Sequence, residues 1–236
     1  MSDPKIASRR EFVQRLGLAV GLTGLGIPHL SQAADKPIPM KPGEILQHLS
    51  SGNQRFINGT TALTPRTPAD FARDVQGQAP PAVILGCADS RVPPEFVFDQ
   101  PIGGLFVLRV AGNMVGSGPI LLGSIEYAVA ELGARLVVVM GHSQCGACKA
   151  AIEHIDNNDQ LPGAIEGMVD YIRPVVRKVR GAGGDKLANV TRENAIQNAK
   201  RLESLGPILP ELVKQQELKI VGAYYEMSTG KVHFLE

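Results

Sequence analysis

Short runs of apolar residues alternate along this chain with longer segments in which apolar residues recur at helical spacing. The runs are 82–86 (AVILG), 105–109 (LFVLR) and 136–140 (LVVVM). Each is apolar on both faces, which is typical of buried parallel strands. Residues 119–133 begin with Pro, end with Gly and carry one apolar stripe, which predicts a helix. Strands that alternate with helices predict an α/β fold, with a mainly parallel central sheet flanked by helices.

The rest of the pattern predicts further helices and a C-terminal hairpin. Residues 42–59 start with Pro, end with Gly and predict an N-terminal helical arm. Residues 60–81 are rich in Thr, Pro and Ala and predict an extended connection. The tail predicts a strand, a turn at Ser228–Gly230 and a short antiparallel edge strand. Other helical patterns lie near 144–157, 163–180, 189–205 and 207–216.

The first 33 residues have the features of a targeting segment. Arg9 and Arg10 precede a mildly apolar, Gly-rich core at 16–27, and small residues follow at Ser31–Ala33. The pattern resembles a twin-arginine signal peptide, which is cleaved on export of the folded protein. It predicts a single mature domain, residues 34–236, located in the periplasm or secreted. A soluble N-terminal helix or an uncleaved anchor is the alternative.

Composition narrows the function only slightly. The chain has 236 residues, is 44% hydrophobic and 20% charged, and has a net charge of +1, which gives no reason to expect nucleic acid as a partner. It has no apolar run of about 18 residues, so no membrane span is expected in the mature chain. Its three cysteines are too few for a disulfide framework.

Candidate ligands follow two of the predicted strands. Cys87, Asp89 and Arg91 come directly after 82–86, and His142 and Cys145 follow 136–140. Because parallel strands end at the same edge of a sheet, these groups are expected to meet there. Two thiolates and one imidazole suit Zn²⁺ in tetrahedral geometry. The alternative is an inert buried Cys87 and a His142 that only caps a helix.

Two groups compete for the fourth position on this metal. Asp89 would close the site and make it inert, whereas water would leave it catalytic. Arg91, two residues on, could hold Asp89 away through a bidentate pair, so that solvent keeps the open position. Two thiolates also neutralise the charge of Zn²⁺ and acidify bound water less than imidazoles would. We therefore expect activity that rises toward alkaline pH.

These blocks together resemble the β-class carbonic anhydrases. The matching segments are CADSR (87–91), FVLRVAGN (106–113), GSIEYAV (123–129) and HSQC (142–145). The resemblance implies reversible hydration of carbon dioxide to bicarbonate by zinc-bound hydroxide. It implies one Zn²⁺ per subunit on Cys87, His142 and Cys145, and a catalytic pair of Asp89 and Arg91. It also implies a homodimer or higher even-numbered homo-oligomer, with the site at a subunit interface.

Further positions are assigned by the same resemblance. Gln78, Phe106, Tyr127 and Gly146 match residues that bind or surround the substrate. Ile84 stands where the bicarbonate-regulated members have tryptophan, so the plant-like subtype with an open site is expected.

Three other functions remain possible at this point. The same scaffold could hydrolyse carbonyl sulfide or carbon disulfide, and a closed site would make a non-catalytic zinc-binding protein. Cys148 forms a Cys-x-x-Cys pattern with Cys145, which invites a thioredoxin-like interpretation. Thioredoxin motifs lack a preceding ligand such as His142, so we expect Cys148 to be a packed thiol.

Overall fold

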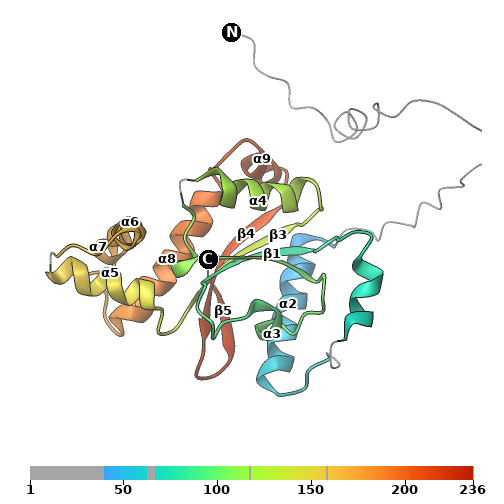
Figure 1. The fold of residues 1–236 in the computed structure, drawn as a ribbon, viewed down its shortest axis with the longest axis horizontal. Helices are drawn as coiled ribbons and strands as arrows, with labels where there is room; N and C mark the ends of the chain where they lie inside the picture. Colours follow the sequence, from blue (N-terminus) through green and yellow to red (C-terminus); the bar gives the residue numbers. More distant parts are fainter. Residues whose placement is uncertain (1–39, 63–66, 117, 158, 236) are drawn as a thin grey trace, which may run out of the picture. The chain divides into compact units, whose positions relative to one another are not determined.

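A computed structural model of the chain describes residues 40–62, 67–116, 118–157 and 159–235 (Figure 1). The predicted signal peptide, residues 1–33, lies outside the described residues. The described part folds around one five-stranded sheet in the order β2-β1-β3-β4-β5. The strands are β1 (Ala82–Gly86), β2 (Leu105–Arg109), β3 (Leu136–His142), β4 (Lys219–Glu226) and β5 (Lys231–Leu235).

Strand direction confirms the predicted fold class. Neighbouring pairs among β1, β2, β3 and β4 are parallel, and only β5 runs antiparallel, against β4. The sequence is therefore that of an α/β protein with a mainly parallel sheet and an antiparallel C-terminal edge. Since β1 and β3 are adjacent, the loops after them lie side by side, as the ligand prediction requires.

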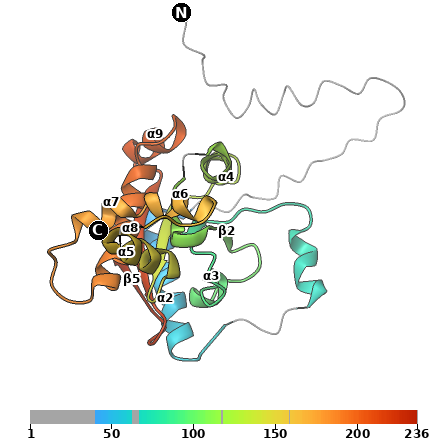
Figure 2. The ribbon, with the colours of Figure 1, turned by 60° about the vertical axis from the view of Figure 1, so that its left-hand side comes forward.

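Helices cover both faces of this sheet. They are α2 (Pro42–Ile57), α3 (Pro94–Val97), α4 (Pro119–Ala130), α5 (Gly146–Asn157), α6 (Ala164–Asp170), α7 (Arg173–Lys178), α8 (Lys186–Leu202) and α9 (Ile208–Lys214). On one face, α2 packs Ile45 and Leu49 into a core with Ile84 and Val138. On the other, α4, α9 and the second half of α8 bury a second core with Val83 and Val137. Figure 2 shows α5, α6 and α7 grouped beside α8.

Helix α8 lies unusually close to β3 and β4. A Cβ atom on Gly222 of β4 would come within 3.2 Å of the Ile196 backbone nitrogen, and one on Gly141 of β3 within 2.9 Å of Thr191. Only glycine allows this approach, which brings polar side chains of α8 beneath the strand ends. Within the described residues, none of the helices combines the length and apolarity needed to cross a membrane.

Four details differ from the expectation. The 60–81 connection contains a 3-10 helix at Pro68–Asp74, and α3 was not predicted. Strand β2 is only half-buried, because it forms the edge of the sheet beside β1. Apolar periodicity reports the residue types of a strand but not how many neighbouring strands it has. The 163–180 helical pattern is divided into α6 and α7, with Pro174 in the first turn of α7.

Candidate metal centre

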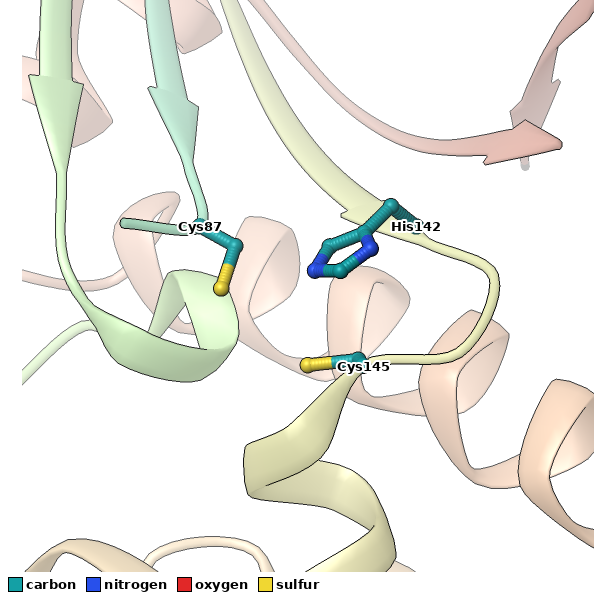
Figure 3. A group of neighbouring side chains, drawn as sticks. All are labelled: Cys87, His142 and Cys145. Atoms are coloured by element: carbon teal, nitrogen blue, oxygen red, sulfur yellow. The ribbon is translucent and has the colours of Figure 1, made fainter. Parts of the chain in front are cut away.

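The three predicted ligands converge from three segments at the carboxyl ends of β1 and β3 (Figure 3). Cys87 directly follows β1, His142 ends β3, and Cys145 directly precedes α5. The two Sγ atoms and the imidazole nitrogen that these residues offer lie within 4.8 Å of one another. Cys87 is 5% exposed, and Cys145 and His142 are fully buried. This is the spacing of groups that share one ion.

The imidazole of His142 is oriented by its neighbour. Its Nδ1 lies 2.9 Å from the carbonyl oxygen of Ser143. A carbonyl oxygen can only accept, so Nδ1 carries the proton and donates it, which leaves the lone pair on Nε2. Nε2 is buried and has no hydrogen-bond partner among the described residues. A buried nitrogen with a free lone pair fits a metal ligand.

Hydrogen bonds to the end of β4 and the residue after it hold the segment between His142 and Cys145 in place. The Ser143 N–H donates to the Tyr225 carbonyl at 2.9 Å, and the Ser143 hydroxyl accepts from the Met227 N–H at 2.9 Å. Gln144 then adopts a positive φ of 56°, which turns the chain sharply into Cys145. The distance between His142 and Cys145 is thereby set by β4 rather than by the loop alone.

Contact with a neighbouring thiol, together with burial, makes both thiols weak acids. Contact with the Cys145 thiol and desolvation raise the pKa of Cys87 to about 12. Contact with the Cys148 thiol and desolvation raise the pKa of Cys145 to about 12. Both sulfurs therefore stay protonated at neutral pH until a cation displaces the protons. Two sulfurs and one imidazole nitrogen are a donor set that fits Zn²⁺.

Asp89 and Arg91 form the predicted bidentate pair beside the ligands. Arg91 Nε donates to Asp89 Oδ1 at 2.9 Å, and Arg91 Nη2 donates to Oδ2 at 2.6 Å. These bonds hold the pKa of the Asp89 carboxyl well below its usual range. The same Nη2 reaches the Gln144 carbonyl at 3.3 Å, so Arg91 links the two ligand loops. Asp89 Oδ2 remains 3.9 Å from His142 Nε2.

The sequence analysis missed two residues, Arg109 and Gly112, that donate hydrogen bonds around Cys87. Arg109, the last residue of β2, donates through Nε to the Cys87 carbonyl at 2.9 Å and through Nη2 to the Asp89 carbonyl. The Gly112 N–H donates to Cys87 Sγ at 3.3 Å. Both donors belong to the FVLRVAGN segment, but the sequence pattern carries no signal for the groups that they contact.

The four substrate-pocket candidates are not all near the metal ligands. Gly146 adjoins Cys145 as the first residue of α5. Gln78 is exposed and lines a separate hollow of about 440 Å³ with Asp74 and the Pro101–Gly104 turn.

Phe106 and Tyr127 lie against each other, away from the ligands. Their ring centroids are 6.5 Å apart, and Phe106 packs against the core that contains Val83. Cys87 belongs to the core on the other side of the sheet. The side chain of Tyr127 is 49% exposed. Within one chain, these two aromatic residues therefore do not enclose the metal centre.

An apolar groove adjoins the metal centre next to β2. It has a volume of about 530 Å³ and runs between the end of β2, the start of α4 and α6. Its lining includes Leu108, Arg109, Met114, Ile120 and Tyr171. Ile120 is 84% exposed, which is unusual for a large aliphatic side chain.

The fold and the site together define an α/β protein with a candidate Cys-His-Cys metal centre at the ends of two parallel strands. A sequence model of the family described as "Carbonic anhydrase" matches residues 82–232. Carbonic anhydrase 2 of Mycobacterium tuberculosis is 37% identical over 184 residues, which cover 78% of this chain and 87% of that protein. A carbonic anhydrase of Pseudomonas aeruginosa is 37% identical over 168 residues, covering 67% and 74% respectively.

Solved structures agree with this grouping. A β-carbonic anhydrase from Coccomyxa, in complex with acetazolamide, superposes with a TM-score of 0.61 at 26% identity, covering 80% of this chain and 86% of that one. A tetrameric β-carbonic anhydrase from Sordaria macrospora shares the fold, with a TM-score of 0.65 at 24% identity over 81% and 97% of the chains. The chain belongs to the β class of the carbonic anhydrase family, and is therefore a lyase.

Proposed function

We propose that this chain binds one zinc ion per subunit through Cys87, His142 and Cys145, and that it hydrates carbon dioxide reversibly to bicarbonate and a proton. The observation that carries the proposal is the convergence of three ligand atoms within 4.8 Å, beside a carboxylate that Arg91 already occupies. Zinc, when bound, supplies the Lewis acidity that lowers the pKa of coordinated water toward neutrality.

The protein's own groups position the reacting water. Arg91 fixes both carboxylate oxygens of Asp89 and keeps the group ionised, so that Asp89 acts only as an acceptor. From its place 3.9 Å from His142 Nε2, Asp89 Oδ2 can accept a hydrogen bond from the water that attacks the substrate. We propose the open form of the site, because the carboxylate that would close it is held by Arg91.

A combined metal and activity measurement tests this function. Purified protein should contain one zinc per chain and should accelerate carbon dioxide hydration in a stopped-flow assay, with rates rising toward alkaline pH. Full zinc occupancy with only background hydration would refute the proposal. Turnover of carbonyl sulfide or carbon disulfide under those conditions would favour the hydrolase alternative, and no turnover of any of them a non-catalytic zinc protein.

Arg91→Ala tests the role of the pair. Without the guanidinium, Asp89 is free to become the fourth ligand, so hydration should fall to background while zinc is retained. Arg135→Ala is the matched control, because Arg135 forms a similar pair with Glu217 at 3.0 Å far from the ligands. Wild-type turnover in Arg91→Ala would contradict the assigned role.

We also propose that the substrate site is completed by a second copy of the chain, in a homodimer or higher even-numbered homo-oligomer. Phe106 and Tyr127 pack on the side of the sheet away from Cys87, and the groove around Ile120 leaves apolar surface uncovered. In this arrangement the two aromatic residues of one subunit line the pocket of the other, with Gln78 and Gly146 as further contacts to substrate. The tetrameric state of the Sordaria macrospora protein supports such an assembly.

Finally, we propose that residues 1–33 direct export by the twin-arginine route to the periplasm or beyond. Paired arginines, an apolar core and a small-residue cleavage site support it. N-terminal sequencing of protein recovered from the exported fraction should begin at Ala34. A chain that starts at its first residues in the cytoplasmic fraction would refute the proposal.

A further inference from the structure

The sulfur of Cys87 receives a hydrogen bond from a tight backbone turn at Ala111–Asn113. The donor, the Gly112 N–H, lies 3.3 Å from Sγ and is buried. Gly112 has a φ of 70° and the following Asn113 a φ of 44°, so two successive residues occupy the left-handed region. Asparagine adopts this region more readily than other non-glycine residues, but at a cost that surrounding contacts must offset.

Within the turn, the Asn113 N–H donates to the Val110 carbonyl at 3.0 Å, and a side-chain contact from α8 is added to this bond. Asn194, which is fully buried, donates through Nδ2 to the Gly112 carbonyl at 2.8 Å. Its Oδ1 accepts from Asn198 Nδ2 at 3.0 Å, and Asn198 Oδ1 accepts from the Val115 N–H at 2.8 Å. The two asparagine amides thus form hydrogen bonds to the backbone on both sides of Asn113.

This arrangement is unusual for a helix that packs against a sheet. Such a helix normally buries an apolar stripe, and α8 buries Val190, Ala195, Ala199 and Leu202 in this way. It also directs Asn194 and Asn198 toward the strand ends at helical spacing. Burying an amide is unfavourable unless it is hydrogen-bonded. Here the amides bond to Gly112 and Val115, in the segment that contacts the Cys87 sulfur.

We propose that Asn194 is a positioning residue of the metal centre, which sets the charge on the Cys87 sulfur by holding the Gly112 N–H in hydrogen-bonding distance. The inference deepens the proposed function, because it concerns the same metal centre. Asn194 does not touch the ligand and acts only through Gly112.

The physical consequence is a change in the sulfur as a donor. A hydrogen bond to a thiolate withdraws electron density from it and fixes its direction. When the bond is lost, the sulfur is a less well-oriented ligand, and its electrons are more easily transferred to a metal. Partners of this kind typically change metal affinity by roughly 10- to 100-fold.

Asn194→Ala tests this inference in the full chain with metal alone. Apparent zinc affinity, measured by competition with a chromophoric chelator, should fall roughly tenfold. In the cobalt-substituted protein, the thiolate-to-cobalt charge-transfer band should move to lower energy. Loss of packing alone would not shift this band in a defined direction. The alkaline rise of the hydration rate should move to higher pH.

Asn189→Ala is the matched control. Asn189 is on the same helix and also donates its side-chain amide to a backbone carbonyl, that of Gly183 at 2.9 Å, but it is half-buried, and this bond is exposed and away from the Cys87 and Gly112 segments. This control should keep wild-type affinity and the wild-type cobalt spectrum. Equal effects of the two substitutions would overturn the proposal.

A folded Asn194→Ala protein with unchanged zinc affinity and an unchanged cobalt band would also overturn it. If that variant fails to fold, Asn194→Ser is measured in its place by the same criteria. In wild-type protein loaded with ¹¹³Cd, the Gly112 amide proton should show scalar coupling to the metal through Cys87, and its absence would refute the contact. The zinc, cobalt and cadmium measurements do not need carbon dioxide turnover, so a failed activity assay leaves them interpretable.

Discussion

The metal end of the sheet and its β2 edge differ in how far one chain buries their side chains. The metal end is buried and hydrogen-bonded, whereas the β2 edge leaves apolar surface exposed. At the metal end, Cys87, Cys145 and His142 are buried, and each neighbouring backbone segment is held by hydrogen bonds from β2, β4 or α8. Along the β2 edge, strand β2 is half-buried, Ile120 is 84% exposed, and an apolar groove lies open.

This difference in burial separates two parts of the proposed function, metal binding and turnover. The ligand geometry is complete within one chain, so metal binding should not need a partner. Under the proposed function, a second copy completes the apolar wall of the substrate pocket, so turnover should depend on that copy. Arg109 connects the two regions, because it lines the groove and donates to the carbonyl groups of Cys87 and Asp89.

Cys145→Ser should have the largest effect, at the metal end alone. Loss of one thiolate removes a ligand, so zinc should fall below stoichiometric content and hydration to background. The metal-dependent rise in melting temperature should vanish as well. Elemental analysis and thermal unfolding measure these outcomes. Cys148→Ser changes an equally buried thiol three residues away and should keep zinc; loss of zinc there would place Cys148 among the ligands.

Ile120→Glu should have the next largest effect, and it should weaken subunit association along the β2 edge. An unpaired charge in an apolar interface costs at least about 2–3 kcal/mol, which weakens subunit association by roughly 100-fold. We expect smaller assemblies in light scattering and reduced turnover, with zinc content unchanged. Val75→Glu replaces a side chain that is 73% exposed outside the groove and should leave assembly intact. An Ile120→Glu protein that stays oligomeric and active would show that the groove is not the interface.

The same division explains how far the sequence could predict the structure. The ends of β1 and β3 were predictable, because uninterrupted apolar runs mark buried strands and their carboxyl ends must meet. The bidentate pair of Asp89 and Arg91 followed from spacing and charge. In these cases, residues near in sequence, or at equivalent strand ends, carry the signal.

The contacts that hold the ligands in place could not be predicted in this way. Asn194 donates to Gly112 across 82 positions, and the reason lies in the left-handed turn at Gly112, which no periodicity reports. The edge position of β2 was missed because an apolar edge strand and a central strand have the same sequence pattern. Phe106 and Tyr127 were assigned by resemblance, which does not say whose pocket they line.

Arg109→Gln should have a smaller effect that spans both regions. The substitution removes the donors to the Cys87 and Asp89 carbonyls, so the loop should lose alignment, and zinc affinity and turnover should each fall about tenfold. Chelator competition and stopped-flow assays measure the two losses. Arg135→Gln, which removes a partner of Glu217, is the control. If only oligomer size changes in Arg109→Gln, then Arg109 belongs to the groove and not to the metal centre.

Asp99→Asn should have the smallest effect, on stability rather than chemistry. Asp99 is 3% exposed and lies between α3 and β2, in the segment that joins the two regions. Burial alone would raise the pKa of Asp99, but hydrogen bonds from Thr61, Arg55 and the Ala62 N–H lower it below its usual value. Because the folded state lowers the pKa, the stabilisation is present above the unfolded value near 3.9 and is lost as pH falls through the folded value.

The difference between wild type and Asp99→Asn should therefore depend on pH. At pH 7 the variant should lose about 1–3 kcal/mol of unfolding free energy, since buried donors lose a charged acceptor. As pH falls through the lowered pKa of Asp99 in the folded state, the two proteins should converge. Urea unfolding at several pH values measures both. Asp170→Asn, at a side chain that is 53% exposed, should change stability by less than about 0.5 kcal/mol at every pH. If the difference in unfolding free energy between wild type and Asp99→Asn did not change with pH, side-chain shape and not charge would stabilise the segment between α3 and β2.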